Sequence, residues 1–277
     1  MNDNTKLKIH SHLLDILAEI NRVCEKNNLT YVLIGGTLLG SIRHDGFIPW
    51  DDDIDVAMPR EDFERFIRLS IKELQPRFCL DYRNTNKKYW LSFAKVRMNG
   101  TSYDENGKGK NSCNNGFWVD IFPLDYTSDN NCPRLKRKKS VIRFFNVLIY
   151  NKCGKKIRDS KGFRKIPHCL IKLIPSSLLF VARNKIMQSD NSKKHVFFVN
   201  YGSQYSIEKQ THLIGEVLPT DKGYFEGKEY CIPKNPKHVL TNIYGPNYMQ
   251  LPPKEKRVTH NPKYIKFEDG EEVFFNE

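Results

Sequence analysis

Residues 46–58, GFIPWDDDIDVAM, hold four aspartates within five positions of an otherwise apolar segment. The DIDVAM part alternates as a strand does, and side chains two residues apart on a strand leave from the same face. Asp53 and Asp55 should therefore share a face, and Asp51 extends their row by one step. Asp52 should point the opposite way and tolerate substitution. Carboxylates held parallel at this spacing repel one another unless a cation lies between them.

A hard divalent cation that prefers oxygen ligands would relieve this repulsion. Mg²⁺, or Mn²⁺ in its place, takes few carboxylates and keeps coordination positions for substrate phosphates. The row therefore predicts one or two such ions. An EF-hand calcium loop would need glycine at its sixth position and glutamate at its twelfth. Counted from Asp51, those positions hold Val56 and Asp62. A solvated acidic loop would also explain the run of acids, and sugar-nucleotide glycosyltransferases likewise use a metal-bound D-x-D.

A second half of the site lies just upstream of the acids. LTYVLIGG reads as a short buried strand that ends in Gly35 and Gly36, and a short helix follows with Thr37 as its expected N-cap. Glycines let a phosphate approach the backbone, and a helix N-terminus offers free N–H groups with partial positive charge. The order of strand, glycine turn, helix and D-x-D strand suits phosphoryl or nucleotidyl transfer, in which positioning and charge neutralisation supply most of the catalysis.

Four further positions are candidates for this site. Asp120 lies in WVDIF on a later strand among large apolar residues, where a buried carboxylate needs a partner such as a metal ion. Lys95, in the middle of SFAKVRM, either reaches a phosphate or points to solvent. Arg43 and His44 precede the acidic strand and either contact phosphate or lie on the surface.

Periodicity predicts helices interspersed with strands, as in an α+β fold. Helices are expected over about 6–27 and 60–74, the second with Ile71 among its apolar positions, and strands over 78–83, 89–98 and 116–125. Asn99-Gly100 should form a turn between strands. Three regions are expected: a catalytic core at 1–130, a basic and amphipathic helical segment at 131–195, and a C-terminal portion at 196–277 that closes the site.

The net charge of +13 is concentrated in one region. Residues 131–195 carry 18 Lys and Arg against two acids, while the rest of the chain carries 27 against 30. Because these bases alternate with Leu, Ile, Phe and Val, the segment is typical of helices that bind an anionic membrane surface. A solvated basic face would also account for the charge, and nucleic-acid binding is a less favoured explanation.

The sequence predicts a cytoplasmic protein, with peripheral attachment to the inner face of the cell membrane through residues 131–195. No apolar run reaches the length of a membrane span, and the N-terminus does not read as a signal peptide. Seven widely spaced cysteines without a C-x-x-C pair suit reduced thiols.

The order of these motifs resembles the nucleotidyltransferase fold of the polymerase-β type, which implies an α+β core with a mixed sheet and flanking helices. More narrowly, GGTLLGSIRHDGFIPWDDDIDVAMPREDFERF at 35–66 resembles the hallmark of the LicD family of cholinephosphotransferases, which is related to fukutin. DIFPLD at 120–125 and YGPNYMQLPPKEKRVTH at 244–260 also look like motifs of that family. The basic middle of the chain matches nothing.

The resemblance implies transfer of phosphocholine from CDP-choline to a hydroxyl of a cell-surface glycan or its precursor, such as lipopolysaccharide, teichoic acid or capsule. It implies that Asp51, Asp53 and Asp55 bind the metal and that Asp120 completes the metal site or takes the acceptor proton. His260 and Trp50 are weaker candidates for the site. The acceptor could also be a lipid-linked glycan met at the membrane.

Two other kinds of function stay open at this point. One is a transferase of the same fold that uses CDP-glycerol, CDP-ribitol or another nucleotide-activated donor. The other is a non-catalytic adaptor that binds a membrane or nucleic acid, against which the intact acids speak.

Overall fold

The computed structural model describes residues 2–105, 115–128, 130–153, 174–191, 196–257, 259 and 262–275. The helices are α1 (Asp3–Lys26), α2 (Gly35–His44), α3 (Arg60–Glu73), α4 (Cys132–Lys152), α6 (Ser176–Met187), α7 (Ile214–Val217) and α8 (Pro236–Tyr244), with short 3₁₀ turns η1 (Glu208–Gln210) and η2 (Lys254–Lys256). The strands are β1 (Val32–Leu33), β2 (Asp55–Pro59), β3 (Phe78–Asp81), β4 (Ala94–Met98), β5 (Ser102–Asp104), β6 (Trp118–Thr127), β7 (Phe197–Val199), β8 (Thr211–Leu213), β9 (Asp221–Phe225), β10 (Lys228–Ile232), β11 (Tyr264–Lys266) and β12 (Glu272–Phe274).

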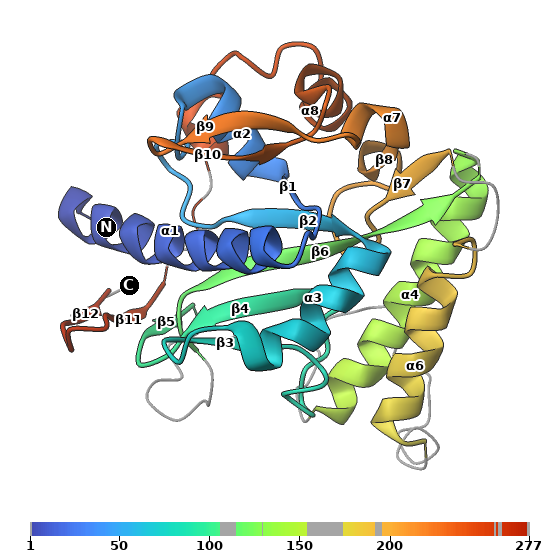
Figure 1. Cartoon of the computed structure of the whole chain (residues 1–277), viewed down its shortest axis with the longest axis horizontal. Helices are drawn as coiled ribbons and strands as arrows, with labels where there is room; N and C mark the ends of the chain where they lie inside the picture. Colours follow the sequence, from blue (N-terminus) through green and yellow to red (C-terminus); the bar gives the residue numbers. More distant parts are fainter. Residues whose placement is uncertain are drawn as a thin grey trace.

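Seven of the described strands form one mixed sheet in the order β1-β2-β6-β4-β3, which β7 and β8 extend (Figure 1). β2 and β6 run parallel, and the other neighbours are antiparallel. β6 is long because it has three partners: its first four residues pair with β4, residues 120–124 pair with β2, and its last three residues pair with β7. The α+β architecture and the mixed sheet expected from the sequence are confirmed, and strands from beyond residue 130 belong to the same sheet.

The two faces of the sheet bury different sets of side chains. Val56 and Ile121 pack into the main core with the apolar positions of α1 and α3. On the opposite face, Phe122 and Leu124 pack with Phe198, which comes from the C-terminal part of the chain. The sheet is therefore covered on both sides, and the second face is closed by elements that follow residue 195.

Several element boundaries differ from the expectation. α2 begins at Gly35 with Ile34 as its N-cap, so Thr37 is a helical residue and not the cap. β2 begins only at Asp55, so Asp53 lies in the loop before the strand. The side chain of Ile71 is 60% exposed although its spacing fits the apolar face of α3. β2 begins at Asp55 because its ladder with β6 begins there, opposite Asp120, which a local pattern does not reveal.

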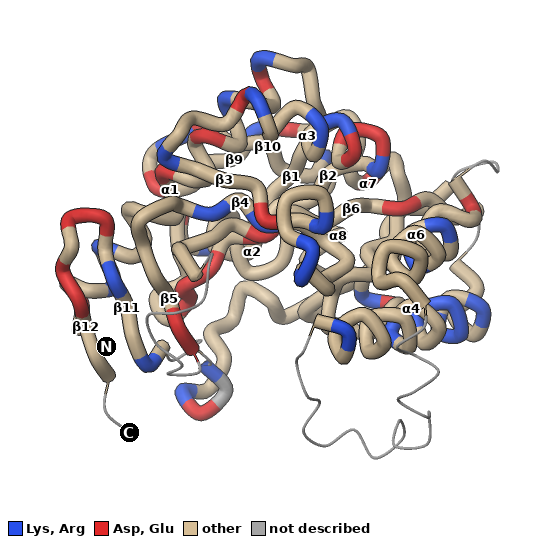
Figure 2. The backbone as a smooth tube through the Cα atoms, turned by 90° about the horizontal axis from the view of Figure 1, so that it is seen from below, with Lys and Arg blue, Asp and Glu red and all other residues tan. Residues whose placement is uncertain are grey.

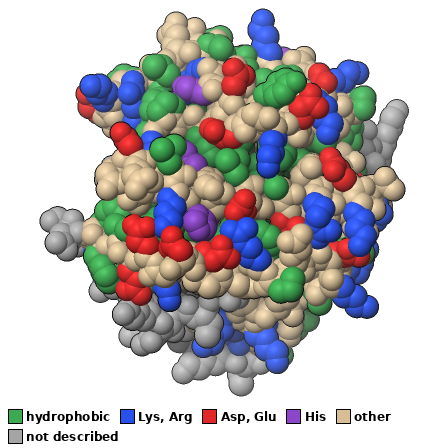
Figure 3. Space-filling model, turned by 60° about the vertical axis from the view of Figure 1, so that its left-hand side comes forward, with side chains coloured by type: hydrophobic (Ala, Val, Ile, Leu, Met, Phe, Trp, Pro, Cys, Tyr) green, Lys and Arg blue, Asp and Glu red, His purple; other side chains and the backbone are tan. Residues whose placement is uncertain are grey.

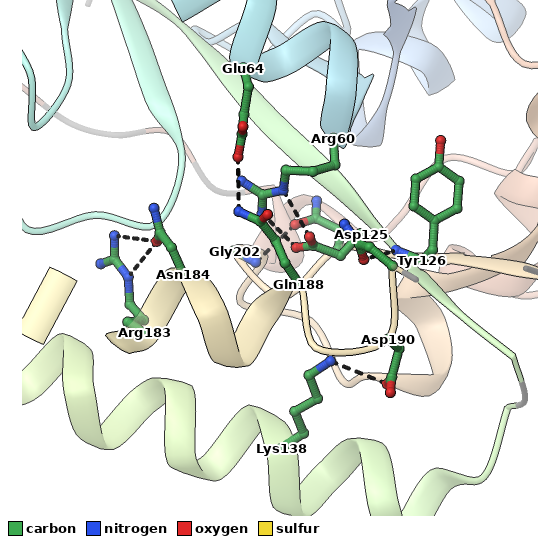
Figure 4. A network of polar contacts seen from close by, with 12 residues as sticks. Arg60, Glu64, Asp125, Tyr126, Lys138, Arg183, Asn184, Gln188, Asp190 and Gly202 are labelled. Carbon is green, nitrogen blue, oxygen red and sulfur yellow. Dashed lines mark hydrogen bonds and ion pairs between the residues drawn. The ribbon is translucent and has the colours of Figure 1, made fainter. Parts of the chain in front are cut away.

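α4 and α6 pack against each other at one end of the sheet (Figures 1 and 4). The fully buried guanidinium of Arg183 on α6 donates to the carbonyl of Trp90 and to Asn146 of α4, at 2.7 and 2.8 Å. Lys138 of α4 pairs with buried Asp190 at 3.3 Å. Part of the basic segment thus serves to dock the helices. No helix in the described ranges is long and apolar enough to cross a membrane.

Candidate active site

Three neighbouring strands place an acid, a second acid and a lysine in one row across the sheet. In the register of the ladders, Asp55 of β2 lies opposite Asp120 of β6, and Asp120 lies opposite Lys95 of β4. Lys95 Nζ donates to Asp120 Oδ1 at 2.6 Å. Lys95 is buried beneath Trp118, with its Nζ 4.3 Å from the ring centroid, so it does not point to solvent.

The glycine turn contacts the acids directly. A β-carbon added at Gly36 would lie 2.5 Å from Asp51 Oδ2, and one at Gly35 would lie 3.3 Å from Asp55 Oδ2. Gly35 has a φ of +57°, a conformation that side chains disfavour. Thr37 Oγ1 accepts a hydrogen bond of 2.9 Å from the Asp55 backbone N–H, which ties α2 to β2. The structure thus brings together the glycine turn and the carboxylates that the sequence separates by some twenty positions.

The loop that carries Asp51 to Asp53 is held by residues from distant parts of the chain. His10 Nε2 of α1 lies 2.9 Å from the Asp51 carbonyl oxygen, and its ring stacks on Phe47 at 3.6 Å. Tyr103 donates its hydroxyl to Asp52 Oδ2 at 2.5 Å. Asp52 is buried by this contact, so the expectation that it tolerates substitution conflicts with its surroundings.

His10 and Tyr103 are positioning residues that the sequence did not reveal. His10 lies 41 positions from Asp51, and Tyr103 lies 51 positions from Asp52. No local sequence pattern therefore connects either residue to the acidic loop. A histidine beside the apolar positions of α1 was the only available signal for His10.

Mutual repulsion dominates the electrostatics of the site. Burial, and next the charge of Asp53, raises the pKa of Asp55 well above its usual value. Asp120 and Asp51 add to that shift, and Lys95 opposes it. Burial also raises the pKa of Asp120, against the pull of Lys95. Crowded carboxylates of this kind gain most from a cation.

The oxygen-only set of side chains suits Mg²⁺ or Mn²⁺. In the described ranges, no three His, Cys, Asp or Glu side chains already stand close enough to hold a metal ion. The repulsion that raises the pKa of Asp55 is nevertheless the one that a divalent cation would relieve. The chemistry of the donor set therefore fits such an ion, with some adjustment of the carboxylates.

The remaining candidates lie around the C-terminal motif. Arg43 Nη1 donates to the carbonyls of Tyr248 and Gln250 at 2.8 and 3.2 Å, so this nitrogen anchors the segment after α8. His44 Nδ1 lies 3.4 Å from Arg43 Nε. Trp50 lies under the guanidinium of Arg257, at 4.4 Å from its ring centroid. His260 is outside the described residues.

A hollow of about 590 Å³, including its open mouth, adjoins Asp55 and Gly35. The sheet face with Phe122 and Leu124 forms its floor, and Val239 of α8 lies among its walls. This is the same face from which Asp55 and Asp120 project, because residues two apart on β6 share a face. Of the candidate groups, Asp55 and Gly35 thus line this hollow.

Comparison with known proteins agrees with the motifs. Residues 28–151 match the family model described as LicD/FKTN/FKRP, nucleotidyltransferase domain. The lipopolysaccharide cholinephosphotransferase LicD of Haemophilus influenzae is 28% identical over 260 residues, which cover 90% of this chain and 92% of that protein. Uncharacterized proteins of Rickettsia typhi and Rickettsia prowazekii are 34% and 35% identical over 140 and 66 residues, or 41% and 23% of their lengths. The resemblance seen in the sequence is confirmed, and residues 28–151 carry a nucleotidyltransferase domain of the LicD/FKTN/FKRP type.

Proposed function

We propose that this chain transfers phosphocholine from CDP-choline to a hydroxyl of a cell-surface glycan or its precursor, in a reaction that requires Mg²⁺ or Mn²⁺. The observation that carries the proposal is the row of Asp55, Asp120 and Lys95 beside the Gly35-Gly36 turn. The similarity to a lipopolysaccharide cholinephosphotransferase over 90% of the chain supports the choice of donor and acceptor. A catalytic core of the polymerase-β type is part of the same proposal.

The carboxylates have two tasks in this reaction. Asp51, Asp53 and Asp55 would hold the divalent ion, which supplies charge neutralisation for the pyrophosphate of the donor. The acceptor hydroxyl attacks the phosphorus that carries choline, and CMP leaves from the opposite side. Asp120 either completes the ion's ligands or accepts the hydroxyl proton, and its raised pKa suits proton transfer.

Lys95 fits this reaction as the counter-ion of Asp120. Its ammonium group balances one of the clustered negative charges, and that pairing favours the ionised form of the carboxyl. A base must be ionised before it can take a proton, so the pair keeps Asp120 available for either task.

Turnover of CDP-choline by the purified protein tests the proposal. CMP release and labelled acceptor would be measured with lipopolysaccharide or a glycan precursor, with and without Mg²⁺. Asp55→Asn should lower kcat by about 10²-fold or more, since it removes one of the carboxylates that neutralise transition-state charge. Asp221→Asn, on an exposed position of the β9–β10 hairpin, is the matched control and should leave kcat unchanged.

Chelation with EDTA should abolish turnover, and added Mg²⁺ or Mn²⁺ should restore it. Undiminished activity of Asp55→Asn, or activity indifferent to EDTA, would contradict the metal assignment. A parallel panel of CDP-glycerol, CDP-ribitol and CDP-ethanolamine decides the headgroup. If none of these donors is turned over or raises the melting temperature, the catalytic proposal fails.

A further inference from the structure

The hollow beside Asp55 has walls that are apolar or uncharged. Apart from Asp55 at its end, it is lined by no Asp, Glu, Lys or Arg among the described residues. Its polar groups come from the segment after β7, which includes Asn200, and from β8, which includes His212. Burial lowers the pKa of His212 to about 4, so its ring is neutral near pH 7. The hollow is therefore suited to an uncharged group.

One polar atom in the lining is left without a partner. Asn200 is 2% exposed, and its Nδ2 has no hydrogen-bond acceptor within the described part of the chain. Its Oδ1 accepts from the backbone N–H groups of Gly202 and Ser203, at 2.9 and 3.2 Å. Those two donors fix which way the amide faces, because only the oxygen can accept from them. A buried donor without a partner costs free energy unless a ligand or water supplies an acceptor.

The segment that presents Asn200 is held in place. The backbone N–H of Asn200 donates to the Gln210 carbonyl at 3.0 Å. Lys139 Nζ of α4 donates to the carbonyl of Ser203 at 2.9 Å and to that of Tyr205. The unsatisfied amide is thus a fixed feature of the wall, and the basic helix α4 helps to fix it.

We propose that this hollow receives the pyrimidine base of the nucleotide donor, with Asn200 Nδ2 donating to a ring carbonyl. The inference rests on the proposed function and adds where the base binds. A flat, uncharged ring with acceptor atoms matches apolar walls, including Phe122 and Phe198, and an N–H donor. A quaternary ammonium headgroup does not match, because it offers no acceptor to Asn200. The position of the hollow next to Asp55 and Gly35 leaves the phosphates of such a nucleotide at the acids.

Two substitutions probe the hollow from different walls. Asn200→Asp keeps an oxygen for the two backbone donors and replaces the N–H donor by an acceptor. Val239→Phe narrows the hollow from α8. Val181→Phe makes the same change on an exposed position of α6 and is the control. Thermal unfolding of each variant establishes that it is folded.

The measurements are the Kd of CMP and of phosphocholine by calorimetry, and the KM and kcat for CDP-choline. Each hollow variant should raise the Kd of CMP and the KM of CDP-choline at least about tenfold, the worth of roughly 1.4 kcal/mol. The Kd of phosphocholine and the values for Val181→Phe should stay those of the unaltered protein.

The other outcomes separate this inference from the proposed function. If the unaltered protein turns over CDP-choline but both variants keep its KM and the Kd of CMP, the base does not bind here and a water satisfies Asn200. If only the Kd of phosphocholine rises, the hollow takes the headgroup, and the inference is wrong. If the unaltered protein neither binds CMP nor turns over CDP-choline, both proposals fail together.

Discussion

Asp52 illustrates how a single contact changes what a residue is expected to tolerate. Its carboxylate is 6% exposed and accepts the Tyr103 hydroxyl, while its neighbours Asp51 and Asp53 contribute to the charge around Asp55. Loss of a partner from a buried polar group costs about 1–3 kcal/mol. Asp52, which is not expected to bind the metal, therefore helps to hold the acidic loop through its contact with Tyr103.

We expect Tyr103→Phe to lower the free energy of unfolding by about 1–3 kcal/mol, because the Asp52 carboxylate loses a hydrogen bond. Urea unfolding followed by circular dichroism measures the change. Asp221→Asn, at an exposed carboxylate, should change stability by less than about 0.5 kcal/mol. An unaltered midpoint for Tyr103→Phe would mean that the hydroxyl adds nothing to the loop.

His212 should make the protein less stable in mild acid. Burial, and then the charge of His238, lowers the pKa of His212 from 6.5 to about 4. Between those values the unfolded chain binds a proton that the folded chain does not, so stability falls as the pH falls. From pH 7.5 to 5.0 this contribution is about 2 kcal/mol.

His212→Gln tests that contribution without an ionisable ring. The loss of stability between pH 7.5 and 5.0, from urea unfolding, should be smaller in the variant by about 2 kcal/mol. Lys237→Gln, at an exposed position of α8, serves as the control. Equal losses in the His212 variant and the unaltered protein would show that the ring is not buried in its neutral form.

At the scale of elements, a buried ion pair joins the start of α3 to the far end of β6. Arg60 binds Asp125 through two hydrogen bonds of 2.8 and 2.6 Å, with side chains 4% and 0% exposed (Figure 4). Asp120, on the same strand, belongs to the candidate site. The pair therefore fixes α3 against the strand that carries Asp120, a candidate active-site acid.

Asp125→Leu alone should lower the free energy of unfolding by about 3–5 kcal/mol, because Arg60 would stay buried without its counter-ion. The double variant Arg60→Met/Asp125→Leu should recover most of that loss. Arg65→Ala, which breaks an exposed pair with Asp62, should cost less than about 1 kcal/mol. A double variant as unstable as the sum of the single variants would contradict this account.

The elements also show how far the sequence could lead. Local periodicity predicted α1, α3 and the strands β1–β4 and β6, since burial of an amphipathic face leaves a local trace. Asp55 and Asp120 became candidates for another reason, because one lies in a D-x-D strand and the other among large apolar residues. The register that places them side by side is a pairing across 65 positions, and Asn200 enters the site region through β7 and the tertiary fold. Such contacts depend on which strands meet, which a single sequence does not encode locally.

At the scale of the whole molecule, charge is distributed unevenly. On the face in Figure 3, acidic and basic side chains lie intermingled, and ion pairs such as Arg77–Glu268 at 2.7 Å connect distant segments. Lys and Arg dominate α4, and α6 adds one exposed base, Lys185 (Figure 2). Leu178 and Val181, which the helical repeat places on the same face of α6 as Lys185, are 58% and 48% exposed. This combination of exposed apolar and basic residues favours an anionic membrane surface over a plain solvated face.

We expect the protein to co-sediment with phosphatidylglycerol-containing vesicles at low salt and to be released as the salt concentration rises. Arg137→Glu/Arg143→Glu, on exposed positions of α4, should lower binding at least about tenfold, since each base near such a surface is worth about 1 kcal/mol. Lys222→Glu/Lys228→Glu makes the same change in net charge on the β9–β10 hairpin and should bind as the unaltered protein does. Failure to sediment at low salt would remove the membrane proposal, and preferential binding of nucleic acid would replace it.

The shared strand β6 has a consequence for recombination among relatives. The composition of the chain changes near residue 130, which would suggest that position for joining the halves of two related proteins. Yet β6 gives its first residues to β4 and its last to β7, so a chimera joined at that point would combine one parent's β6 with another parent's β7. The β6–β7 ladder and the packing of Leu124 with Phe198 would then join residues from two different parent proteins. An exchange that begins after β8 keeps the seven-stranded sheet from one parent, but it still pairs β11 of the second parent with β5 of the first.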